Sequence, residues 1–276
     1  MIELGKKNRL KVVKEVDFGM YLDGGDHGEI LLPTRYVPKG CKPGDEIDVF
    51  LYLDQDERLI ATTLQPLAEV GQFACLEVAW VNEHGAFLNW GLMKDLFCPF
   101  REQKQRMVQG NHYVVYVKVD EDSYRIMATA KVEKYLSTQR PPYKHGDEVQ
   151  LLVWQKTDLG FKVIVDNKYQ GLVYDNQIFR ALHTGDTLTG YVDHIRQDGK
   201  MDITIQRTGR QLALDFSSTL LQYLKEHGGR CHLCDKSDAA EITMLFKVSK
   251  KTFKKAVGDL YRQRLIAISD EGITLL

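Results

Sequence analysis

The sequence predicts a mainly β multidomain chain, in which three tandem antiparallel barrels precede a C-terminal α+β domain. Two observations predict this organisation. Short runs of alternating apolar residues recur up to about residue 210, whereas apolar residues at helical spacing appear after it. A turn in which glycine precedes a polar residue also recurs, each time before an alternating run, at Gly44, Gly110, Gly146 and Gly185.

The alternating runs form three repeats, at about residues 5–64, 68–132 and 144–207. Each repeat has three strands, a longer connection, the glycine turn and two closing strands. Five antiparallel strands in a segment of this size are typical of the OB-fold, a small closed barrel. We therefore expect three barrel domains, at residues 1–64, 65–139 and 140–210.

Residues 211–276 show a different pattern, which indicates a fourth domain. A leucine-rich helix up to Glu226 is followed by two glycines and a short strand. Asp238 and Ser249 are expected to cap two further helices, the second ending near Leu265. A hairpin closes the chain. This order of elements is that of a winged helix, a helix-turn-helix variant.

Charge is distributed unevenly along a chain whose net charge is −1. The four expected domains carry −3, −1, +1 and +2 in order. Phosphate binding requires cations, so we expect the third barrel and the C-terminal domain to supply most of the electrostatic attraction to a nucleic acid. No apolar run is long enough to span a membrane, and the first residues do not resemble a signal peptide, so we expect a cytoplasmic protein.

Neither catalysis nor metal binding is expected. The chain has no nucleophile elbow, phosphate-binding loop or zinc-protease helix motif. Cys231 and Cys234 have zinc-knuckle spacing, but a structural zinc site needs four ligands and no second pair exists. The carboxylates lie mainly in turns. We therefore expect a protein without an enzymatic activity, cofactor or metal.

Several short motifs resemble those of S1-type RNA-binding domains. That family has an aromatic-Gly-x-aromatic step after its first strand, and the corresponding segments here are 18–21, 84–87 and 159–162. Its Gly-Leu-Val-His element is matched by residues 28–31 and 171–174, with the histidine replaced. Its closing Asp and Arg are matched by Asp54 with Arg58 and by Asp120 with Arg125, while Arg196 and Lys200 take that place in the third repeat.

The order of three such barrels and a winged helix resembles the bacterial conserved virulence factor B family. Segments 235–237, 246–258 and 260–266 carry this resemblance, which covers essentially the whole chain. The resemblance implies RNA binding and a role in regulating bacterial gene expression, including that of virulence genes.

Aromatic rings on a barrel face can stack single-stranded bases, and neighbouring cations can contact the phosphates. An alternating strand would place Phe18 and Tyr21 on opposite faces unless a bulge intervenes, and Gly19 makes a bulge reasonable. An aromatic residue on a barrel strand can equally belong to the core. The candidate RNA-binding residues of the barrels are Phe18, Tyr21, Arg58, His84, Phe87, Lys156, Phe161, Lys162, Tyr169, Tyr174, Arg180, Arg196 and Lys200.

Four lysines near the start of the last helix are further candidates, namely Lys250, Lys251, Lys254 and Lys255. Their mutual repulsion would be relieved by a polyanion, although they can also form a solvated face. Lysines contact phosphates and imply no sequence readout. The expected partner is single-stranded RNA. Alternatives are duplex DNA, bound by a transcription factor through the winged helix, and RNA polymerase or the ribosome, contacted by a scaffold protein.

Overall fold

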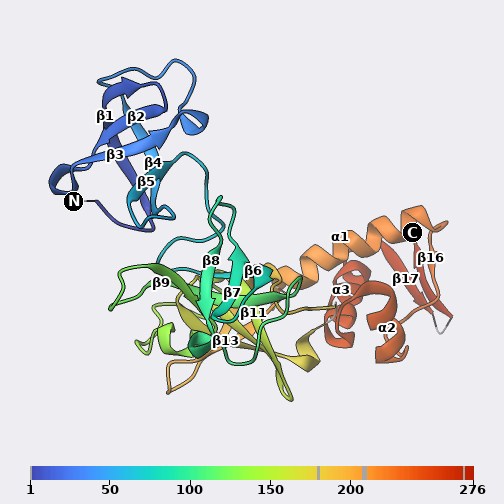
Figure 1. The fold of residues 1–276 in the computed structure, drawn as a ribbon. Helices are drawn as coiled ribbons and strands as arrows, with labels where there is room; N and C mark the ends of the chain where they lie inside the picture. Colours follow the sequence, from blue (N-terminus) through green and yellow to red (C-terminus); the bar gives the residue numbers. More distant parts are fainter. Residues whose placement is uncertain (1, 179–180, 207–209, 270) are drawn as a thin grey trace. The chain divides into compact units, whose positions relative to one another are not determined.

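The structure is a computed structural model that describes residues 2–178, 181–206, 210–269 and 271–276, with the backbone alone for 210–215. It contains three closed five-stranded barrels and a small three-stranded sheet accompanied by three α-helices (Figure 1). The chain divides into two compact units, Met1–Leu136 and Ser137–Leu276. The fold class expected from the sequence is confirmed, whereas the four expected domain boundaries remain a prediction.

The first barrel closes in the order β1-β2-β3-β5-β4, with β3 and β5 parallel and the other pairs antiparallel. This connectivity is that of an OB-fold. The strands are β1 (Lys7–Val16), β2 (Gly19–Asp23), β3 (Glu29–Pro33), β4 (Glu46–Leu53) and β5 (Leu59–Thr62).

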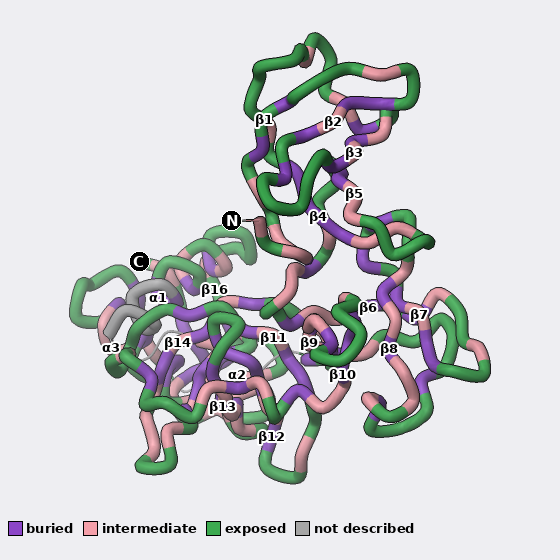
Figure 2. The backbone as a smooth tube through the Cα atoms, turned by 60° about the vertical axis from the view of Figure 1, so that its left-hand side comes forward, coloured by how far each residue is buried: buried purple, intermediate pink, exposed green. Residues whose placement is uncertain are grey.

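The second and third barrels repeat the same topology. The second consists of β6 (Phe73–Val81), β7 (Gly85–Asn89), β8 (Leu96–Pro99), β9 (His112–Val119) and β10 (Ile126–Thr129). The third consists of β11 (Glu148–Thr157), β12 (Gly160–Val165), β13 (Tyr169–Tyr174), β14 (Thr187–Ile195) and β15 (Met201–Thr204). Figure 2 shows that buried positions concentrate on the strands and that the loops are mostly exposed.

In each barrel, a recurring glycine turn forms hydrogen bonds with the first strand. Gly44 N–H donates to Val12 O, and Val12 N–H donates to Asp45 O, both over 2.8 Å. Gly110 and Gly185 make the equivalent pairs of bonds to Val78 and Val153. The turn thus docks the start of the fourth strand on the first strand and closes the barrel. Gly146 is different, because it precedes the first strand of the third barrel and bonds to Val192 O.

The C-terminal part has the expected order of helix, strand, two helices and hairpin. Its elements are α1 (Arg210–Glu226), β16 (Arg230–Cys231), α2 (Ala239–Phe246), α3 (Lys250–Arg262), β17 (Ile266–Ser269) and β18 (Gly272–Leu275). Asp238 and Ser249 cap α2 and α3 through their side chains, as expected, and α3 ends three residues earlier than expected.

Candidate nucleic-acid interface

Each barrel carries a glycine that brings its second strand close to its third. A Cβ atom on Gly19, Gly85 or Gly160 would lie 2.1, 2.4 and 2.0 Å from the carbonyl oxygens of Leu32, Cys98 and Val173. No side chain can occupy such a position without moving the backbone. These three glycines therefore mark equivalent positions, and they allow the three barrel faces to be compared residue by residue.

A bulge in the first strand of each barrel sets which side chains face outward on this surface. The pairing shifts between Val12 and Lys14, between Val78 and Trp80, and between Val153 and Gln155. After the shift, Lys14 pairs with Tyr21 and Trp80 pairs with Phe87. A bulge reverses the alternation of side chains, and the residues directly after the shift, Lys14, Trp80 and Gln155, are exposed.

In the first barrel, Phe18 is 57% exposed and Tyr21 is half-buried. Their rings meet edge to face with centroids 6.3 Å apart, so the two lie on one side of the barrel. Lys14 Nζ lies 4.8 Å from the Tyr21 ring and also pairs with Glu29. Arg58 is held by Asp54 and Asp56, at 2.8 and 2.9 Å. The hydrogen bond with Asp54 raises the pKa of Arg58, and the local carboxylates offset its charge.

In the second barrel, Phe87 belongs to an aromatic cluster that sequence reasoning only partly identified. The Trp80 and Phe87 rings are parallel, with centroids 3.6 Å apart, and Phe97 lies 4.9 Å beyond Phe87. Trp80 is 42% exposed, and its indole N–H donates to Asp95 over 2.9 Å. His84 is exposed in the neighbouring turn beside Glu83. The alternating pattern had grouped Trp80 with inward residues, and the bulge turns it outward.

In the third barrel, aromatic rings and cations also lie together. Lys156 Nζ lies 4.5 Å above the half-buried Phe161 ring and pairs with Asp175. Arg196 donates to the Tyr174 hydroxyl over 2.8 Å and to Asp202 over 2.9 Å. Lys200 pairs with Asp198, and Lys162 lies 5.2 Å from the ring of Trp154.

Two predictions for the third barrel need correction. Tyr169 is only 5% exposed and belongs to the barrel core, so it cannot stack a base while the barrel is folded. Leu172 pairs with Lys162, and Leu31 pairs with Tyr21, each partner lying two residues after the equivalent glycines Gly160 and Gly19. Gly171 therefore corresponds to Ile30. Tyr174 therefore corresponds to Pro33, and the apparent match with residues 28–31 is two residues out of register. Arg180 lies outside the described residues.

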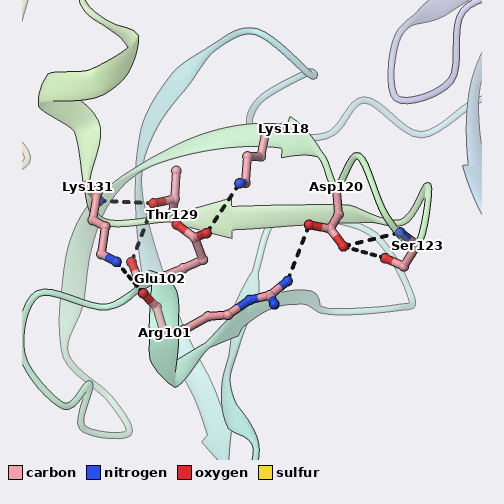
Figure 3. A network of polar contacts seen from close by, with 7 residues as sticks. All are labelled: Arg101, Glu102, Lys118, Asp120, Ser123, Thr129 and Lys131. Carbon is pink, nitrogen blue, oxygen red and sulfur yellow. Dashed lines mark hydrogen bonds and ion pairs between the residues drawn. The ribbon is translucent and has the colours of Figure 1, made fainter.

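A polar network occupies another part of the second barrel (Figure 3). Lys118 donates to Glu102 over 3.3 Å, and Asp120 accepts from Ser123 and pairs with Arg101. Burial alone would raise the pKa of Glu102, but bonds from Thr129 and Lys118 outweigh it and lower the pKa. The bond from Ser123 is the largest effect that lowers the pKa of Asp120. Each charged side chain of this network has a polar partner, so the network offers no unpaired base for catalysis.

The lysines of α3 have a different environment from the cations of the barrels. Lys251, Lys254 and Lys255 are exposed, and no carboxylate among the described residues pairs with them. Lys250 is half-buried, and its Nζ donates to Lys236 O over 3.4 Å. The opposite side of the helix is buried through Phe253, Ala256 and Val257. The helix therefore presents uncompensated positive charge to solvent.

Two further features of the described residues are their metal-ligating side chains and the apolarity of their helices. Cys231 and Cys234 are both buried, and no group of three or more His, Cys, Asp or Glu side chains in the described ranges is arranged to hold a metal ion. Burial raises the pKa of the Cys231 thiol. None of the described helices has the length and apolarity that a membrane crossing requires.

Comparison with known proteins identifies the domains at both ends. A model of the S1 domain matches residues 4–64, and a model of the CvfB-like winged helix domain matches residues 218–275. Conserved virulence factor B of Staphylococcus aureus (strain N315) is 21% identical over 239 residues, covering 84% of this chain and 80% of that protein. The two domain matches and these relatives support the expected similarity to the conserved virulence factor B family.

Other comparisons extend over nearly the whole chain. The uncharacterized protein YitL of Bacillus subtilis (strain 168) is 26% identical over 269 residues, covering 94% of this chain and 89% of YitL. A crystal structure of a multidomain protein with nucleic acid binding domains from Streptococcus pneumoniae TIGR4 has 23% identity and a TM-score of 0.47, covering 99% of this chain and 98% of that one. The two matched domain types bind nucleic acids and are not enzymes, and together with the virulence factor B relatives they indicate nucleic-acid binding and a regulatory role.

Proposed function

We propose that the protein is a non-catalytic, cytoplasmic regulator of gene expression that binds single-stranded RNA, and that its targets include transcripts of virulence genes. One observation carries the proposal. The first two barrels carry a ring with a stacking partner at the same outer position, as Lys14 on Tyr21 and Trp80 on Phe87. In the third barrel, Lys156 lies over Phe161 at the neighbouring strand pair, one residue nearer the glycine. Rings on a barrel surface stack unpaired bases without needing a defined sequence.

The α3 lysines supply the electrostatic part of the proposed interaction. The barrel cations Arg58, Lys156, Arg196 and Lys200 are each paired with a carboxylate of their own barrel, whereas Lys251, Lys254 and Lys255 are exposed and uncompensated. We therefore assign most counterion release to α3 and mainly base stacking to the barrels. The names of the Staphylococcus relatives support the regulatory role in virulence.

The first prediction concerns these two groups of cations. Lys251→Ala with Lys254→Ala should weaken binding to a single-stranded RNA about tenfold and reduce the slope of log K against log salt by about 1.4, because two phosphate contacts are lost. Arg196→Ala with Lys200→Ala should reduce the slope less. Filter binding at several salt concentrations measures both quantities.

The matched control is Lys7→Ala with Lys11→Ala, which removes two exposed cations from β1. The control should leave the affinity and slope almost unchanged. Equal affinity in the wild type, the α3 variant and the Arg196 and Lys200 variant would reject the assigned surface.

Duplex DNA is the second candidate ligand, because the uncompensated lysines lie on the second helix of a helix-turn-helix pair, where recognition helices lie. Titration with duplex DNA and single-stranded RNA under the same conditions separates the two. We expect tighter binding to RNA. Tighter binding to duplex DNA would replace the RNA proposal with that of a transcription factor. A scaffold for RNA polymerase or the ribosome would instead keep its partner after nuclease treatment.

A further inference from the structure

The first unit contains a cleft with a volume of about 1050 Å³ between the β4–β5 hairpin of the first barrel and the outer face of the second. The hairpin contributes one wall, formed by Tyr52, Leu53, Gln55 and Glu57. The second barrel contributes the rings of Trp80, Phe87, Trp90 and Phe97, with polar groups around them. A cleft of this size with a group of aromatic rings in a mainly apolar lining and a few polar groups is typical of sites for small ligands or single ligand groups.

Several contacts fix the two walls relative to each other. Lys94 Nζ donates to the carbonyl oxygens of Leu53 and Asp54, at 3.1 and 2.7 Å. Burial lowers the pKa of Lys94. Arg125 of the second barrel pairs with Glu57 of the hairpin, and Phe50 packs edge to face on Trp90 with centroids 5.7 Å apart. The cleft is therefore formed by two packed barrels that share a core cluster.

The indole of Trp80 offers one open face to this cleft. Phe87 covers the other face in a nearly parallel stack, with an angle of 4° between the rings. The bond from the indole N–H to Asp95 fixes the ring in its plane. The 42% exposure of Trp80 consequently belongs to the free face and the edge. A preorganised, half-exposed aromatic ring binds another flat ring at a low cost in conformational entropy.

Cations are not in excess around the cleft, which is lined by the cations Lys94, Arg101 and Arg125 and by the carboxylates Glu57, Glu83, Asp95 and Asp120. Arg101 pairs with Asp120, and Arg125 pairs with Glu57. Paired cations attract phosphate weakly, so the cleft does not favour an isolated anion. Gln55 and the carboxylates at the rim can exchange hydrogen bonds with a neutral group that has donors and acceptors along its edge. A nucleobase has this combination of two flat faces and a polar edge.

We propose that this cleft binds one unpaired nucleobase, stacked on the open face of Trp80, and that the β4–β5 hairpin of the first barrel contacts the polar edge of that base. The inference rests on the proposed function, because an RNA strand is the source of the base. It also assigns a role to the acidic first barrel. Its hairpin completes the site of the second barrel and helps to select the base.

Tryptophan fluorescence of the full chain tests the proposal. Trp90 and Trp154 are 3% and 7% exposed, so Trp80 is the accessible tryptophan among the three. Titration with an oligoadenylate and, separately, with adenosine monophosphate should quench the wild-type emission to a plateau. The plateau should disappear in Trp80→Phe and persist in the control Trp154→Phe. Loss of the indole stack should weaken oligoadenylate binding about tenfold, as expected for one stacked base.

A second readout does not depend on folding of the variant. Bound oligoadenylate should protect the wild-type emission from quenching by acrylamide. Gln55→Ala should change the ratio of affinities for oligoadenylate and oligouridylate while leaving the salt slope unchanged. Saturation by the oligomer alone identifies an RNA strand as the source of the base, and equally tight saturation by the monophosphate identifies a free nucleotide. Either result supports a nucleobase site.

Failure of this inference is distinguishable from failure of the proposed function. If the oligomer binds in the filter assay without quenching or protecting Trp80, the cleft is not a nucleobase site and the proposed function stands. If the oligomer does not bind but the monophosphate quenches Trp80, the site stands and the RNA proposal falls. If neither ligand changes the emission or the acrylamide accessibility, the inference is overturned.

Discussion

At the scale of single residues, pairing of charges decides which cations are available for phosphate. Arg196 and Lys156 are expected from the sequence to contact phosphates, but each is held by a carboxylate of the same barrel. Counting charges along the chain cannot detect such pairs, because Arg196 and Asp202 meet only through the β14–β15 pairing. Lys251, Lys254 and Lys255 of α3 are exposed opposite an apolar stripe, as their helical spacing indicates, whereas Lys250 is half-buried. Their role in RNA binding remains a prediction.

Aromatic residues show a similar limit. Phe18, Phe87 and Phe161 were found through a motif next to glycine, and all three have exposed or half-buried rings. Trp80 was not selected, since alternation with Leu76 and Val78 predicts an inward position. The bulge that turns it outward depends on the glycine turn docking on Val78, which is a contact between distant segments. Tyr169 was selected wrongly because burial in a barrel core cannot be read from residue type.

A prediction at this scale concerns Glu102. Its pKa is lowered in the folded state, so its ionised form contributes stability above the unfolded value of about 4.3, and this contribution is lost as the pH falls through the folded pKa. Glu102→Gln should therefore lower the free energy of unfolding by about 1–2 kcal/mol at pH 7, because Lys118 loses its charged partner. Urea unfolding at pH 7 and at pH 3 measures the difference.

The difference between Glu102→Gln and the wild type should shrink at pH 3. Glu77→Gln, at an exposed position of β6, serves as the control and should change stability little at either pH. A loss that is the same at both pH values would show that the ion pair with Lys118 does not cause it.

At the scale of elements, the fold could be predicted well wherever local chemistry sets the boundaries. Capping residues predicted the starts of α2 and α3, and glycine turns predicted the starts of β4, β9, β11 and β14. The length of α1 was underestimated, since residues 210–216 belong to the helix although the leucine pattern begins later. Register between strands was predicted least well, because it depends on which bulge forms rather than on the apolar pattern.

The N-cap of α3 gives a prediction at this scale. Ser249 Oγ accepts from Thr252 N–H over 3.1 Å. Ser249→Ala should destabilise the C-terminal domain by about 1 kcal/mol, since a donor in the first turn loses its partner. Hydrogen exchange of peptides covering 250–262 should become faster.

The control for this variant is Lys255→Ala on the exposed face of the same helix. It should leave hydrogen exchange of α3 unchanged while reducing the salt dependence of RNA binding. Unaltered exchange in Ser249→Ala would contradict the role of the cap in holding α3.

At the scale of the whole molecule, the same barrel fold occurs three times with three different sets of outward side chains. The docking of the glycine turn and the close approach of the second and third strands recur in all three barrels. The outward side chains differ, so the first barrel is acidic, the second carries the stacked indole and the third carries paired cations with aromatic rings. The sequence predicted the repeat because turns and alternation are local, whereas the shared core of the first two barrels arises from contacts between domains.

The central claim is that single-stranded RNA contacts the aromatic faces of the barrels and the lysines of α3. Photo-crosslinking of a single-stranded RNA to the full chain, followed by mass spectrometry of the crosslinked peptides, tests this claim most directly. We expect crosslinks to peptides that contain Trp80 or Phe87, Phe161 or Tyr174, and residues 250–255. Crosslinks confined to other surfaces, such as the exposed side of β1 near Lys7 and Lys11, would contradict the claim.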